Sequence, residues 1–131
     1  MYNNLSGYQN TVKNRIENAC HETLMVMLFD GMITRIKQAK ERLDAGQEVN
    51  AKSCIIRAMK IADALMDSLN NDTENETVKN IENLYYFVIS ELNAASKGSD
   101  AVTHLNNDQK VLEVLFDVWK KLEEKVLNES K

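Results

Sequence analysis

The chain has 131 residues, the size of one domain, and is long enough to bury a core without disulfides or bound metals. The net charge of −4 comes from interleaved acids and bases, and no basic block or face stands out, which argues against nucleic acid or an anionic membrane as the partner. No apolar run reaches the ~20 residues of a membrane span and the N-terminus is polar, so we expect a cytosolic protein in which Cys20 and Cys54 are reduced.

Apolar residues recur with helical periodicity in four segments, and the chain contains no proline. The predicted helices cover roughly residues 22–45, 49–69, 76–95 and 107–127. Short links join them, so neighbouring helices should be antiparallel. The sequence therefore predicts an all-α, antiparallel up-down four-helix bundle with a short N-terminal segment packing outside it. We expect a single domain over 1–131, with a cap segment at 1–18 and the bundle at 20–129.

Each predicted helix carries one apolar line at steps of three and four, as the seam of a bundle requires. The predicted core lines are Leu24, Leu28, Met32, Ile36, Ala39 and Leu43 in the first helix; Ala51, Ile55, Ala58, Ala62, Leu65 and Leu69 in the second; Val78, Ile81, Tyr85, Val88, Leu92 and Ala95 in the third; and Val111, Leu115, Val118, Leu122 and Val126 in the fourth. Gly46, directly after the first helix, is predicted to be its C′ residue.

The helices carry more apolar side chains than these lines need. The additional residues are Met25, Phe29 and Ile33 in the first helix, Ile56, Met59 and Met66 in the second, Tyr86 and Ile89 in the third, and Leu112, Phe116 and Trp119 in the fourth. Some of them can widen the core stripe, since globular bundles often bury three of seven positions. For the whole set we expect an open apolar surface that a partner chain or the N-terminal segment covers. Its methionines suit a groove that adapts to another helix, although they also fill gaps in cores.

A glycine inside the most apolar part of the first helix needs a reason, because it costs a helix about 1 kcal/mol relative to Ala. Gly31 stands there, directly after Asp30. We hypothesise that Gly31 lets another backbone approach closely, either that of a neighbouring helix or that of a bound partner. Asp30, at the polar boundary, is then placed to bind a loop amide or a partner arginine.

Four stretches of the chain resemble, in order and spacing, the FliS family of flagellar export chaperones. The first helix matches that family's pattern through Leu24, Met27, Leu28, Asp30, Gly31, Ile33, Lys37 and Ala39. "AKSCIIRAMKIADALMDSL", "NLYYFVISELNAAS" and "LEVLFDVWKKL" resemble its second, third and fourth helices. The chain departs from the pattern where Cys20 and His21 replace a Ser-Pro pair before the first helix, and where Phe29 replaces a tyrosine.

The resemblance implies a cytosolic chaperone that binds the disordered C-terminal segment of flagellin, prevents premature polymerisation and aids delivery to the flagellar type III export apparatus. It implies no enzyme activity and no cofactor. In such proteins an aliphatic residue and a tyrosine three apart in the N-terminal segment can lie over the client site, and Leu5 and Tyr8 match that pair. The residues expected to bind the partner are Leu5, Tyr8, Met25, Phe29, Asp30, Gly31, Ile33, Ile56, Met59, Met66, Tyr86 and Ile89.

Two other functions stay open from the residues alone. One is a generic helical adaptor that buries its second apolar stripe in a homodimer. The other is a phosphotransfer bundle that uses His21 or His104, although both histidines are isolated in the sequence. We find no metal framework, no phosphate-binding glycine loop and no paired carboxylates for acid–base catalysis in the sequence. The resemblance implies export-gate components as further partners, and the homodimer alternative implies self-association.

Overall fold

The computed structural model describes residues 21–69 and 75–129. The described residues form the helices α2 (His21–Asp44), α3 (Glu48–Ser68), α4 (Glu76–Ser96) and α5 (Ala101–Glu129). They contain no strand, and each helix packs against the next, with α5 returning to α2. The predicted all-α four-helix bundle is confirmed. The proposed N-terminal cap segment lies outside the described residues.

The turn between α2 and α3 has the geometry that the sequence predicts. Gly46 adopts a φ of +74°, a left-handed conformation that favours glycine. Its N–H donates to the carbonyl of Leu43 at 3.1 Å, and the N–H of Gln47 donates to the carbonyl of Arg42 at 2.8 Å. This pair of bonds is the Schellman motif, in which the left-handed residue is C′. Gly46 therefore ends α2 as predicted and reverses the chain into α3.

The predicted starts of the first three helices lie within one residue of the observed ones, and the predicted start of the fourth does not. Asn75 caps α4, since its side-chain oxygen accepts from the N–H groups of Thr77 and Val78 at 2.9 and 3.3 Å. The prediction that the last helix begins near Asn107 is wrong, because α5 begins at Ala101. A polar residue, Asp108, occupies a core position there, which hides the continuing apolar line from a search for hydrophobic periodicity.

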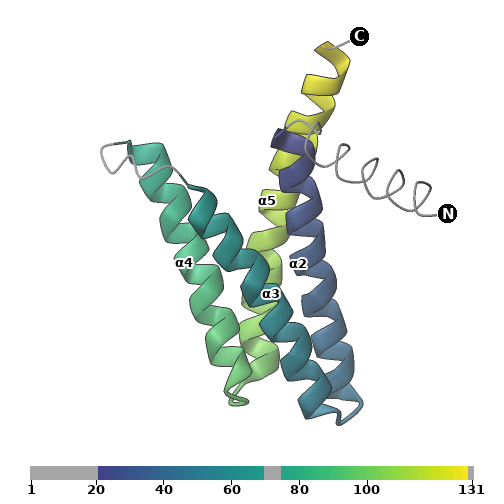
Figure 1. Ribbon diagram of the computed structural model, residues 1–131. Helices are drawn as coiled ribbons and strands as arrows, with labels where there is room; N and C mark the ends of the chain where they lie inside the picture. The colour runs from purple at the N-terminus through teal and green to yellow at the C-terminus, as the bar shows by residue number, and fades with distance from the viewer. Residues whose placement is uncertain (1–20, 70–74, 130–131) are drawn as a thin grey trace, which may run out of the picture.

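The four helices are paired in space as well as along the chain (Figure 1). The α2–α3 and α4–α5 turns lie at one end of the bundle, and the pair α3/α4 diverges from the pair α2/α5 towards the other end. α5 has 29 residues and α4 has 21, so α5 is longer by about 12 Å at 1.5 Å per residue. The C-terminal part of α5 therefore continues beyond the part of the bundle where four helices meet.

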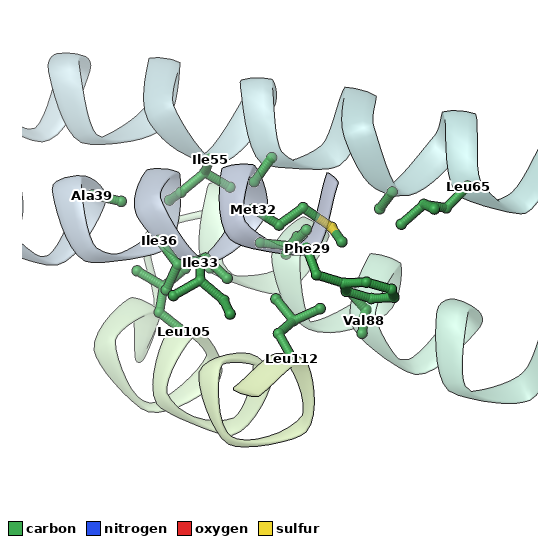
Figure 2. Packing of buried hydrophobic residues seen from close by; sticks show 14 of the residues in the cluster. Phe29, Met32, Ile33, Ile36, Ala39, Ile55, Leu65, Val88, Leu105 and Leu112 are labelled. Carbon is green, nitrogen blue, oxygen red and sulfur yellow. The ribbon is translucent and has the colours of Figure 1, made fainter. Parts of the chain in front are cut away.

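The core follows the predicted lines in α3 and α4, but it is wider than the predicted line in α2 and lies on a different line in α5. All five predicted positions from Ala51 to Leu65 in α3 and all four from Tyr85 to Ala95 in α4 are buried. In α5 the predicted line is wrong, because Val118 and Leu122 are exposed. The buried line there is Ala101, Leu105, Asp108 and Leu112. Figure 2 shows Leu105 and Leu112 beneath the α2 side chains Ile33, Ile36 and Phe29.

Candidate functional site

Three α2 residues predicted to line an open surface lie inside the bundle instead. Met25, Phe29 and Ile33 are 4%, 0% and 7% exposed. The Phe29 ring packs at 6.3 Å, between ring centroids, from the ring of Tyr85 on α4. The expectation that this line is exposed is wrong, because α2 faces both α3 and α5 and needs a wide apolar stripe. These three residues hold the bundle together and offer no surface to a partner in this conformation.

The predicted residues of α3 and α4 do reach the surface. Tyr86 and Ile56 are 54% and 40% exposed, and Met59, Met66 and Ile89 are half-buried against the core. We call these five residues the α3/α4 surface. Successive residues of a helix are turned by 100° about its axis, so one residue with a known contact fixes the direction in which the others point. Ile61 marks the flank of α3 that faces α2, and Glu91 marks the flank of α4 that faces α5.

On α3 the predicted residues lie on the flank opposite Ile61, and on α4 they lie on the flank opposite Glu91. Met59 and Met66 therefore face towards α4, and Tyr86 and Ile89 face towards α3. The structure thus brings the predicted α3 and α4 residues to a common, partly open junction. It does not bring the α2 residues there.

A second exposed apolar line was missed because the sequence analysis assigned most of it to the core. Val114, Val118 and Leu122 of α5 are 63%, 48% and 40% exposed. They recur at steps of four and so occupy one side of the helix. We call them the α5 line. The sequence carried no signal for it, because only the packing of Leu115, Phe116 and Trp119 against the core shows that this other face of α5 turns outward.

Asp30 and Gly31 lie at the edge of the packed region. Asp30 is exposed. A Cβ built on Gly31 would meet Cδ1 of Ile61 at 3.4 Å, an ordinary contact, so the position lies beside a side chain of α3 and has room for an alanine but not for a large side chain. The neighbour at this position is a side chain, whereas we had expected a backbone. Leu5 and Tyr8 lie outside the described residues, and their role as a cover stays a prediction.

A buried carboxyl group stands apart from the apolar surfaces. Asp108 is fully buried, and neither of its carboxyl oxygens has a hydrogen-bond partner. Burial, with a smaller contribution from the charge of Glu91, raises the pKa of Asp108 to about 8. Glu91 itself lies 2.6 Å from Nδ1 of His104, measured from Oε2. Asp108 is therefore mostly protonated at neutral pH, and its ionisation in this buried position destabilises the fold.

Both histidines contact side chains of neighbouring helices. The His21 ring packs edge-on against Trp119 at 5.4 Å between centroids, which joins the start of α2 to α5. His104 joins α5 to α4 through Glu91. In the described part of the chain, no three His, Cys, Asp or Glu side chains are placed to hold a metal ion. No described helix combines the length and apolar character needed to cross a bilayer.

Two comparisons show which known proteins this chain is similar to. Residues 2–126 match the profile of a protein family described as "Flagellar protein FliS". The chain is also 26% identical over 118 residues to a protein of Salmonella typhimurium strain LT2 named "Flagellar secretion chaperone FliS". That alignment covers 89% of this chain and 87% of the relative.

Proposed function

The chain belongs to the FliS family, and from this premise we propose that it is a flagellar export chaperone that binds the disordered C-terminal segment of flagellin in the cytosol. Binding keeps the client from polymerising before export, and the complex delivers it to the export apparatus, whose components are the second class of partner. The family is one of chaperones rather than enzymes. Its match over nearly the whole chain is the observation that carries the proposal.

The exposed apolar residues supply a physical mechanism. A client segment that packs by helix–helix contacts in a filament is apolar on one face and gains little by folding alone. The α3/α4 surface offers such a face the flank of two packed helices, with Ile56 and Tyr86 accessible and Met59 able to change rotamer. The client then folds on the chaperone, and its self-association is blocked while it is bound.

A long interface is needed for useful affinity, because ordering the client costs free energy. The α5 line adds apolar area on another helix of the bundle, and its three residues span about two turns. We therefore propose that the client occupies both the α3/α4 surface and the α5 line as separate short helices. The buried residues Met25, Phe29 and Ile33 act indirectly, by holding α2 under these surfaces.

Binding of a flagellin C-terminal segment, measured by isothermal titration calorimetry, tests the proposal. We expect a one-to-one complex, and we expect Ile56→Glu with Tyr86→Glu to weaken it by about tenfold or more, since each places a charge in an apolar contact. Thr34→Glu with Thr103→Glu, at exposed positions of α2 and α5, is the matched control and should bind normally. No binding of the wild-type chain at high micromolar concentration would refute the function.

Light scattering of the chaperone alone tests the adaptor alternative. A tight homodimer at low micromolar concentration that is broken by the Ile56→Glu and Tyr86→Glu pair would show that a second copy occupies the α3/α4 surface. A monomer would support a surface reserved for the client.

A further inference from the structure

The outward face of α3 carries a stripe of cations with apolar residues between them. Its six residues line one shallow hollow of about 350 Å³, and they are Val49, Lys52, Ser53, Ile56, Arg57 and Lys60. At 100° per residue they fall on one side of the helix, opposite the buried line from Ala51 to Leu65. We call them the α3 stripe. The stripe therefore faces away from the core, and all six residues are exposed.

The charge of the α3 stripe is of one sign. Residues 49–62 contain three bases and no acid, although the whole chain has a net charge of −4. Within 21–69 and 75–129, no acidic side chain forms an ion pair with Lys52, Arg57 or Lys60. The sequence analysis found no basic face, because three cations over nine positions are inconspicuous until the helix aligns them. They make a local positive surface on an acidic protein.

A second hollow lies near the start of α3, on the side of the helix that faces the core. It has a volume of about 250 Å³ and an apolar floor that includes Ala51, Ile55 and Ala95. Lys52 lines both hollows, and Lys97 adds another cation at this one, beside the single acid Glu48. The surface thus offers small apolar recesses with cations at their rims.

We propose that the α3 stripe docks a helical segment whose carboxylates, repeated at helical spacing, meet Lys52, Arg57 and Lys60 while an apolar side chain lies on Ile56. The inference rests on the proposed function, because the segment is taken to be part of the flagellin client. Ile56 belongs to both the α3 stripe and the α3/α4 surface, so one client helix can contact both. Lys52 and Lys60 are eight residues apart, or about 12 Å along the axis, which a partner helix matches with acids two turns apart.

Charge complementarity favours an acidic peptide over nucleic acid. A nucleic-acid site has clustered cations that follow a phosphate backbone, usually on a basic domain. Here Ile56 lies between the cations and Val49 precedes them, and these two residues are 40% and 83% exposed. Apolar contact flanked by opposite charges is the pattern of helix-in-groove recognition, in which the charges set the partner and its register.

The test compares two triple variants with the same change in charge. Lys52→Gln, Arg57→Gln and Lys60→Gln together remove the α3 cations. Lys37→Gln, Arg42→Gln and Lys79→Gln together remove two lysines and one arginine from exposed positions elsewhere. We expect the first triple variant to bind the flagellin C-terminal segment about tenfold more weakly than wild type at low salt. Its affinity should also depend less on the salt concentration than that of wild type. We expect the second to behave nearly as wild type.

The second half of this double-mutant cycle is a client segment whose acidic residues are replaced by Asn and Gln. We expect the wild-type chaperone to bind it about tenfold more weakly, and the α3 triple variant to bind both client forms equally. Equal losses in both triple variants, or unchanged binding in the α3 variant, would overturn this inference and leave the proposed function standing. Failure of the wild type to bind the unmodified segment would refute both. Tighter wild-type binding of a short DNA duplex than of the client would also overturn it.

Discussion

The helices α2 and α5 lie side by side but use their apolar residues in opposite ways. α2 buries seven apolar side chains between α3 and α5. α5 is longer, yet its buried residues include only three apolar ones, accompanied by Asp108 and Glu123, while Val114, Val118 and Leu122 are exposed. The difference shows that an apolar line does not by itself mean burial. Whether it is buried depends on whether that face of the helix meets a neighbour, since Leu115 and Trp119 pack against the core at the level where Val118 is exposed.

The largest expected effect tests this contrast directly. Phe29→Ala should reduce the free energy of unfolding by about 3–5 kcal/mol, because it empties a fully buried site next to Tyr85. Val118→Ala removes an exposed apolar side chain and should change stability by less than about 0.5 kcal/mol. Urea denaturation followed by circular dichroism measures both. Similar losses in the two variants would mean that α5 is buried as deeply as α2.

A pH-dependent effect should follow from the carboxyl group in the α5 core. The pKa of Asp108 is about 8 in the fold against an ordinary 3.8, so between these values the unfolded chain has released a proton that the folded chain still holds. Asp108 therefore lowers stability as pH rises, by about 2 kcal/mol between pH 6 and pH 8. Below pH 3.8 this penalty is absent.

Asp108→Asn should remove that contribution to the pH dependence. The comparison is the free energy of unfolding at pH 6 and pH 8, relative to wild type, by urea denaturation. Asp117→Asn, at an exposed position of the same helix, should retain the wild-type difference. If Asp108→Asn follows the wild-type pH dependence, the carboxyl group is ionised throughout this range and therefore hydrated.

The smallest expected effect concerns the glycine in α2. Gly31→Ala should stabilise the protein by about 0.5–1 kcal/mol, because a Cβ meets Ile61 at an ordinary 3.4 Å and the helix gains from the exchange. Gly31→Leu should instead destabilise it, since the larger side chain must displace Ile61. Thermal and urea unfolding measure both changes. A Gly31→Leu variant as stable as Gly31→Ala would show that α3 does not constrain this position.

Helix number, type and order could be predicted from the sequence, because hydrophobic periodicity is a local property. The predicted lines of α3 and α4 proved correct wherever both neighbours of the helix are present, as for Ile55 and Leu92. The turn at Gly46 could also be predicted, because only a few residues favour a positive φ. The start of α5 could not, because Asp108 interrupts the periodicity at a core position.

The candidate site was only partly predictable. Ile56 and Tyr86 were identified because they lie off the core line of helices with a narrow stripe. Phe29 was misassigned for the converse reason, since the number of helices that cover α2 is a property of the fold. The α5 line and the α3 stripe were missed because exposure and alignment of charge depend on which face of each helix turns outward.

Periodicity, turn residues and ordered motifs are local properties of a chain, and they were enough to predict four amphipathic helices in an up-down bundle and the resemblance to the FliS family. Which apolar residues stay exposed could be read only from the packing of the helices. Burial depends on which face of each helix meets a neighbour. The fold therefore buries Phe29, leaves Val118 in solvent and places Lys52, Arg57 and Lys60 on one outward face.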